Sequence, residues 1–118
     1  MIDVSDLIGI PYKENGRTIE GLDCYGLAIE VEKRYGKTLR DAVYENHNEE
    51  LSQIWEPLLN IKKTDILTEG CLIEIHIKGT LHIGVAIGNG LMIHATINQG
   101  VRISRLAAYK IAAIYEVI

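Results

Sequence analysis

Three residues of the sequence carry side chains that suit nucleophilic catalysis: Cys24, His82 and His94. Cys24 falls in the first turn of a predicted helix, where unpaired N–H groups and the helix dipole favour the thiolate and lower the pKa of the thiol. A histidine beside a cysteine can accept its proton, and a second polar residue can orient that histidine. Together the three residues indicate a thiol nucleophile with a histidine base. Cys24 also has a simpler alternative role, as one more apolar residue of the buried helix face.

The predicted helix that begins at Cys24 has consistent start and stop signals. Asp23 stands at the N-cap position and Gly36 follows the last turn, so the helix is expected over residues 24–35. Gly26 in its first turn costs about 1 kcal/mol relative to alanine, which suggests that another group, such as a substrate, closely approaches the backbone there. Helical spacing predicts one buried face and one solvated face. The buried face would hold Cys24, Leu27, Ala28, Val31 and Tyr35, and the solvated face Glu30, Glu32, Lys33 and Arg34.

The loop between two predicted strands decides whether the histidines can cooperate. His82 and His94 lie in strands on either side of Gly88-Asn89-Gly90, which is a strong hairpin signal. With a two-residue turn, Asn89-Gly90, the two imidazoles would point to opposite faces of the sheet. With a three-residue loop, His94 pairs with Gly84, and His82 becomes its diagonal neighbour on the same face. The catalytic hypothesis therefore predicts the three-residue loop, with the small Gly84 leaving room beside the histidines.

The elements divide into a helical first half and a strand-rich second half, which predicts an α+β fold rather than alternating βαβ units. A second helix is expected over about residues 48–59. From residue 71 onward the apolar residues recur at every second position, which indicates strands. We expect N-terminal helices packed on an antiparallel sheet of about five strands, in a single domain over residues 1–118. The expected strands cover residues 71–77, 81–87, 91–97, 101–104 and 112–118.

The composition excludes several classes of protein. With 118 residues, 47% of them hydrophobic, the chain can bury one core without disulfides or structural metal. Its net charge is -4 and its 12 Lys and Arg residues are dispersed, so nucleic acid is not an expected partner. The apolar stretches are too short to span a membrane, and the acidic start lacks the plan of a signal peptide. We therefore expect a cytoplasmic protein, as synthesised, with no membrane partner.

The two cysteines, Cys24 and Cys71, lie far apart and form no C-x-x-C motif, which argues against a disulfide framework or a zinc ribbon. Cys71 shares one face of a predicted strand with three isoleucines, so we interpret it as a core residue. A metal site is chemically possible, but no spacing typical of zinc ligands supports it. We expect neither a metal nor a cofactor. The residues that such a metal site would use are Asp23, Cys24, His82 and His94.

Five segments of the sequence, taken in order, resemble the motifs of the NlpC-type cysteine peptidases, the papain-like cell-wall hydrolases of bacteria and phages. This resemblance implies a papain-like fold in which Cys24 is the nucleophile, His82 the base and His94 the polar residue that orients the base. It also favours the register that brings the two histidines together. The segments cover nearly the whole chain and are Gly9-Ile10-Pro11-Tyr12, Gly21-Leu22-Asp23-Cys24-Tyr25-Gly26-Leu27, His82-Ile83-Gly84-Val85-Ala86-Ile87-Gly88-Asn89-Gly90, Ile93-His94-Ala95 and Gly100-Val101-Arg102-Ile103.

The same resemblance implies which residues contact a substrate. Tyr12 and Asp23 match positions that line the substrate pocket of the family, and Gly84 would leave room on the histidine face. The backbone N–H of Cys24 would contribute to the oxyanion hole. Tyr25 stands next to the pocket, where many members have serine and phage tail members often have an aromatic residue. The chain is therefore expected to be most similar to the phage tail-associated members.

The activity that the resemblance implies is hydrolysis of an amide bond in a peptidoglycan stem peptide or muropeptide. The expected bond joins γ-D-glutamate to the diamino acid. Two other functions stay open at this level. The same fold can serve as an inactive, structural part of a phage tail, with tail proteins as partners. Alternatively, the same Cys-His pair can transfer the acyl group to an amine in place of water.

Overall fold

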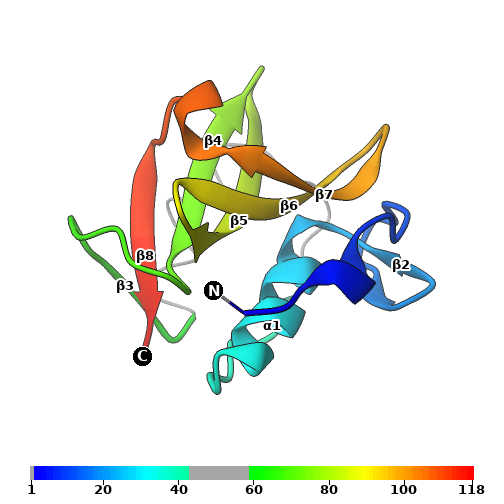
Figure 1. Cartoon of the computed structure of the whole chain (residues 1–118), viewed down its shortest axis with the longest axis horizontal. Helices are drawn as coiled ribbons and strands as arrows, with labels where there is room; N and C mark the ends of the chain where they lie inside the picture. Colours follow the sequence, from blue (N-terminus) through cyan, green and yellow to red (C-terminus); the bar gives the residue numbers. More distant parts are fainter. Residues whose placement is uncertain (1, 43–58) are drawn as a thin grey trace.

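The computed structural model describes residues 2–42 and 59–118 of the chain (Figure 1). The expected helix over residues 48–59 falls almost wholly outside the described residues. The first described part contains η1 (Ser5–Leu7), β1 (Arg17–Thr18), β2 (Gly21–Leu22) and α1 (Cys24–Arg34). The second part contains β3 (Ile61–Lys63), β4 (Leu72–Ile77), β5 (Thr80–Gly88), β6 (Leu91–Thr96), β7 (Gly100–Arg105), η2 (Leu106–Ala108) and β8 (Ala113–Val117).

Strands β3 to β8 form one antiparallel sheet in the order β3-β8-β4-β5-β6-β7 (Figure 1). The α+β class is confirmed, and the sheet has one strand more than expected. The additional strand is β3, which pairs with β8 at the edge. It was not predicted because two of its three residues are the exposed Lys62 and Lys63, so it lacks the alternating apolar pattern of the other strands.

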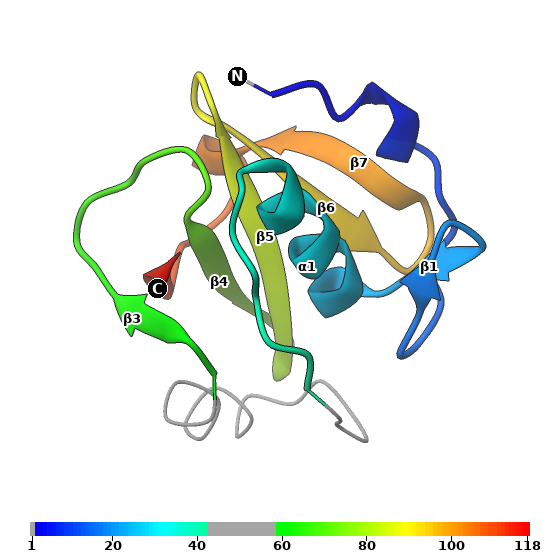
Figure 2. The same ribbon diagram turned by 90° about the horizontal axis from the view of Figure 1, so that it is seen from below.

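Helix α1 begins at the residue that the sequence predicts. The Asp23 carboxylate accepts a hydrogen bond from the backbone N–H of Gly26 at 2.8 Å, and Gly36, with φ of +78°, follows the last turn. The predicted apolar face packs against β5 and β6 (Figure 2). Glu32 was expected on the solvated face, and this prediction is wrong. Its side chain is fully buried, because Gly70 lies against that side of the helix.

The sheet is covered on both faces by apolar side chains. The larger core lies between α1 and the sheet and includes Leu27, Val31, Leu72, Ile83 and Val85. The smaller core lies on the opposite face and contains Ile73, Ile75, Ala86, Met92 and Leu106. The described part of the chain holds no helix with the length and apolar character that crossing a bilayer requires.

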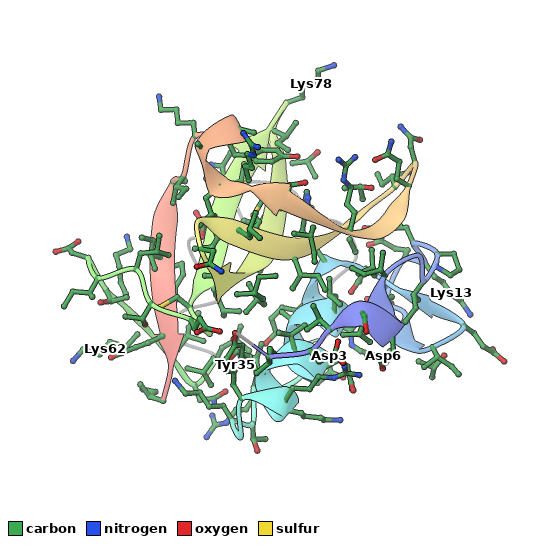
Figure 3. All side chains as sticks on the ribbon, in the orientation of Figure 1. Asp3, Asp6, Lys13, Tyr35, Lys62 and Lys78 are labelled. Atoms are coloured by element: carbon green, nitrogen blue, oxygen red, sulfur yellow. The ribbon has the colours of Figure 1, made fainter. Side chains whose placement is uncertain are left out.

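The N-terminal segment is tied to both halves of the fold. The backbone N–H of Gly9 donates to the Val101 carbonyl, and the N–H of Val101 donates to the Ile10 carbonyl, both at 2.9 Å. Asp6, which is labelled in Figure 3, forms an ion pair with Arg34 near the end of α1, with Oδ2 to Nη2 at 2.7 Å. The loop that follows pairs with β2 through backbone hydrogen bonds of its own.

The β5–β6 hairpin corrects one expectation and confirms another. Gly88 pairs with Leu91, so the turn has two residues, Asn89 and Gly90, both with positive φ. The expected three-residue loop is therefore wrong. Further along, Gly84 pairs with His94 as predicted, because the register shifts between Ala86 and Gly88. A β-bulge adds one residue to β5 and so changes the parity of the pairing, as a third loop residue would have done.

Candidate active site

The predicted nucleophile and both histidines line one cleft. Cys24 comes from the start of α1, His82 from β5 and His94 from β6, and the cleft has a volume of about 1190 Å³. Three further segments form its walls: the loop after residue 11, the β4–β5 turn and the β6–β7 turn. The other residues that line the cleft are Tyr12, Glu14, Ile77, Lys78, Gly79, Thr80, Leu81, Ala95, Thr96, Ile97, Asn98 and Tyr109.

Three polar side chains form a hydrogen-bonded chain across strands β5, β6 and β7. Nε2 of His82 lies 2.7 Å from Nδ1 of His94, and Nε2 of His94 lies 2.8 Å from Oγ of Ser104. The two imidazole rings meet edge to face, with their centroids 5.0 Å apart and their planes at 73°. The ring of Tyr109 contacts that of His94 in the same manner at 5.6 Å. Both edges of the His94 ring are therefore held by polar partners.

Burial determines the protonation state of His94. Only 1% of this residue is exposed, and this burial lowers the pKa of its imidazole to about 4. The nearby charges of His82 and Arg102 lower the pKa further. At neutral pH the His94 ring is therefore neutral and carries a single N–H, so it can donate one ring hydrogen bond and must accept the other.

The Cys24 thiol lies in surroundings that oppose its ionisation. The residue is 3% exposed, and burial, followed by the charge of Asp23, raises the pKa of the thiol to about 12. Hydrogen bonds from the backbone N–H groups of Ile83 and Tyr25 act in the opposite direction and lower the pKa. The sequence predicted a lowered pKa, from the helix N-terminus and a charged histidine beside the thiol. That prediction is wrong for the resting site, because the loss of water outweighs the effect of the helix N-terminus.

The carboxylate of Asp23 is turned into the protein. It is fully buried, and its Oδ1 accepts hydrogen bonds from Gly26 N at 2.8 Å and from Arg17 Nη1 at 2.9 Å. Its Oδ2 accepts one from Asn15 N at 2.9 Å. Asp23 was expected to line the substrate pocket, but it is not among the described residues that line the cleft. Its observed contacts fix the start of α1 and therefore the position of Cys24.

Another part of the protein occupies the space that a side chain at position 26 would need. A Cβ at this position would collide with the Gly16 carbonyl oxygen and would lie 3.1 Å from Nη1 of Arg17. The sequence suggested that a substrate approaches here, whereas in the structure Gly16 and Arg17, at the start of β1, lie against the helix. The absence of a side chain at Gly26 lets that segment close over Asp23.

The substitution Gly26→Ala tests this contact, because helix propensity and the collision predict opposite changes in the free energy of unfolding. Helix propensity alone predicts that Gly26→Ala stabilises the protein by about 1 kcal/mol. The collision with the backbone of Gly16 predicts the opposite, a decrease of about 1–3 kcal/mol in the free energy of unfolding. Urea denaturation followed by circular dichroism measures the change. An increase in stability would show that the β1 segment does not press on α1 in solution.

The remaining predicted substrate-binding residues occupy different places. Tyr12 lines the cleft, and its hydroxyl donates to Oε2 of Glu14 at 3.3 Å. Tyr25 is buried, and its hydroxyl donates to the Arg40 carbonyl, so its side chain does not line the described cleft. Gly84 is also not among the residues that line the cleft, and a Cβ there would approach Sδ of Met92 at 2.8 Å. Its small size serves packing around the histidine strands.

Sequence reasoning missed two partners of His94, Ser104 and Tyr109. Ser104 was expected near the end of a strand, but its contact with His94 depends on the β6–β7 register, in which His94 pairs with Arg102 and Met92 with Ser104. That pairing makes Ser104 the diagonal neighbour of His94. Tyr109 follows η2, and no pattern in the sequence indicates that this segment returns to the cleft.

Within residues 2–42 and 59–118, no three His, Cys, Asp or Glu side chains are grouped as metal ligands.

Comparison with known proteins agrees with this fold. The structure is similar to the NlpC/p60 domain of the peptidoglycan hydrolase SagA, with a TM-score of 0.66, 21% identity, and coverage of 94% of this chain and 90% of that one. It is similar to an NlpC/P60 family protein from Bacillus cereus, with a TM-score of 0.64, 25% identity, and coverage of 92% and 35%. It is also similar to NlpC2 from Trichomonas vaginalis, with a TM-score of 0.66, 22% identity, and coverage of 94% and 42%.

The sequence itself matches a family model. No curated protein matches the chain at a significant level. The model of the NlpC/P60 family matches residues 9–115, which is most of the chain and includes every residue of the cleft. The chain therefore belongs to the NlpC/P60 family and is a hydrolase of the cysteine peptidase class.

Proposed function

We propose that the chain cleaves an amide bond in the peptide part of peptidoglycan, with Cys24 as nucleophile, His82 as base and His94 as the residue that orients the base. The observation that carries this proposal is a single cleft lined by Cys24, His82 and His94, in which the two histidines are hydrogen-bonded to each other. The similarity to a domain of a peptidoglycan hydrolase supports the substrate class.

The raised pKa of the thiol constrains the first step. A thiol with a pKa of about 12 stays protonated at neutral pH, so its proton must pass to His82 as the sulfur attacks the carbonyl carbon. Nε2 of His82 is engaged with His94, which leaves Nδ1 to exchange the proton with Cys24. The resulting imidazolium donates its Nε2–H to Nδ1 of His94. In this proposal the backbone N–H of Cys24, at the start of α1, stabilises the developing oxyanion.

The remaining steps return the site to its starting state. The His82 imidazolium protonates the leaving amine as the C–N bond breaks, and a thioester forms between Cys24 and the acyl part of the substrate. A water molecule then attacks the thioester, with His82 as its base, and releases the acid and the thiol. Acyl transfer to an amine would follow the same path, with the amine in place of water.

The cleft carries charges of both signs, which suits a stem peptide. Glu14 contributes a carboxylate beside Tyr12, and Lys78 lies at the tip of the β4–β5 turn (Figure 3). A peptide with γ-D-glutamate and a diamino acid presents both carboxylates and an amine. We propose the bond between these two residues as the one cleaved. Association with a phage tail stays a prediction of the sequence resemblance.

The test incubates the protein with defined stem peptides and identifies the products by mass spectrometry. We expect cleavage after γ-D-glutamate by the wild type and by Cys71→Ala, and no cleavage by Cys24→Ala. Turnover by Cys24→Ala equal to that of the wild type would refute the nucleophile. Stem peptides left intact by the wild type would refute the substrate. An added amine that appears in the product would show acyl transfer.

A further inference from the structure

We propose that Ser104 is a positioning residue of the catalytic site, and that its hydroxyl keeps the proton of His94 on Nε2 so that His82 can act as base through Nδ1. The contact that carries this inference is the 2.8 Å separation between Oγ of Ser104 and Nε2 of His94. The inference rests on the proposed function and adds to it a residue on a third strand, β7.

The chain of three side chains can hold its protons in two ways. In the first, His82 donates from Nε2 to Nδ1 of His94, and His94 donates from Nε2 to Ser104. In the second, every donor and acceptor is reversed, so Ser104 donates to His94, and His94 donates to Nε2 of His82. His82 then carries its own proton on Nδ1 and cannot accept one from the Cys24 thiol. Only the first arrangement is competent for the proposed attack.

The competent arrangement is also the only one available once His82 is charged. The imidazolium of His82 has a proton on both ring nitrogens, so its Nε2–H must be donated to Nδ1 of His94. The neutral His94 ring then has its single proton on Nε2, inside the protein, and Ser104 supplies the acceptor. A buried N–H without an acceptor costs about 1–3 kcal/mol. Because this charge exists during the reaction, loss of the acceptor should lower kcat.

The surroundings of His94 indicate that Ser104 is the hydrogen-bond partner of its Nε2. The His94 ring is nearly inaccessible, with the ring of Tyr109 against it and His82 at its other nitrogen. The pKa of the ring is lowered to about 4, so the ring is neutral near pH 7. Its single proton can then be on Nδ1 or on Nε2. Arg102, its pairing partner on β7, has its Nη1 engaged by Oε1 of Gln99. Ser104 is the described side chain that meets Nε2.

A pair of variants with the same shape tests the role of the hydroxyl. Ser104→Thr keeps a hydroxyl and Ser104→Val replaces it with a methyl group, while both side chains suit a β-strand. We expect Ser104→Thr to retain kcat on a cleavable stem peptide within about threefold, and Ser104→Val to lose roughly tenfold in kcat with an unchanged KM. Equal kcat values for Ser104→Thr and Ser104→Val would overturn the proposal, because only packing would then matter.

A second measurement does not depend on activity. Long-range proton–nitrogen NMR spectra of protein with 15N-labelled histidine report which ring nitrogen of His94 carries the proton. We expect the Nε2–H tautomer in the wild type and in Ser104→Thr, and a mixture of tautomers in Ser104→Val. The Nδ1–H tautomer in the wild type, or unchanged spectra in Ser104→Val, would refute the role of Ser104. Failure of the proposed function would instead show as a wild type with the expected tautomer that cleaves no stem peptide.

Discussion

The His82→Gln variant is expected to turn over stem peptide at neutral pH on the order of 10⁴-fold more slowly than the wild type. The reason is the buried thiol of Cys24, whose pKa is raised to about 12. Without a base, only about one thiol in 10⁵ is ionised at pH 7. Glutamine can still contact His94 but cannot accept the proton. Single-turnover kinetics on a defined stem peptide measure the loss.

The pH dependence of His82→Gln provides a sharper result than its rate at one pH. Once His82 is absent, hydroxide must remove the thiol proton, so the rate should rise about tenfold per pH unit up to the highest pH at which the protein stays folded. The matched control is His76→Gln, because His76 lies on β4 outside the cleft and contacts Glu74. It should keep the wild-type rate. A near-normal rate for His82→Gln, or a rate independent of pH, would remove His82 from the mechanism.

The second large effect concerns stability and arises from Glu32. This residue is fully buried in α1, and neither of its carboxylate oxygens has a hydrogen-bond partner among the described residues. Burial raises the pKa of the carboxyl to about 7, although the charge of Lys37 acts in the opposite direction. The folded protein therefore keeps a proton that the unfolded chain releases at about pH 4.5.

The sign of the resulting pH dependence follows from proton binding. Between about pH 4.5 and 7 the folded state binds one proton more than the unfolded state, so the free energy of unfolding falls as the pH rises. The stabilising contribution of Glu32 is complete below pH 4.5 and is lost as the pH passes 7. The total loss is about 3 kcal/mol. Urea denaturation from pH 4 to pH 9 measures it.

The variants Glu32→Gln and Glu30→Gln isolate this contribution. Glutamine has the shape of glutamate and no titrating proton, so Glu32→Gln should remove most of the decrease in stability between pH 4.5 and 7. Glu30 lies on the same helix at a partly exposed position beside Arg34, so Glu30→Gln should leave the decrease in place. If Glu32→Gln and the wild type show the same pH dependence, the Glu32 carboxyl is not buried in solution.

Much of the fold follows from local patterns in the sequence. The start of α1 was predictable because Asp23, a favoured N-cap residue, directly precedes the helical apolar pattern, and its carboxylate accepts the capping hydrogen bond from Gly26 N. The strands were predictable from alternating apolar residues, except for β3, whose lysines hide the pattern. Glu32 was assigned to the wrong face because helical periodicity shows only which side of a helix is mostly apolar. It does not reveal that a distant loop, here at Gly70, covers one further residue.

The hairpin shows how a correct pairing can follow from an incorrect loop. Chemistry required His82 and His94 on one face, and a parity change between the strands was the only way to obtain it. The sequence cannot distinguish an extra loop residue from a β-bulge, because both add one residue between the paired positions. In the folded chain the bulge lies near Ile87, between Ala86 and Gly88, and the turn keeps its two residues, Asn89 and Gly90.

Residue types and local patterns were enough to propose Cys24, His82 and His94 as nucleophile, base and orienting group. Tertiary structure decided their environment. It buried the thiol and raised its pKa, turned Asp23 and Tyr25 away from the cleft, and brought Ser104 and Tyr109 to His94. The physical reason is that desolvation and contacts between strands depend on residues distant in sequence, whereas capping and periodicity depend on neighbours.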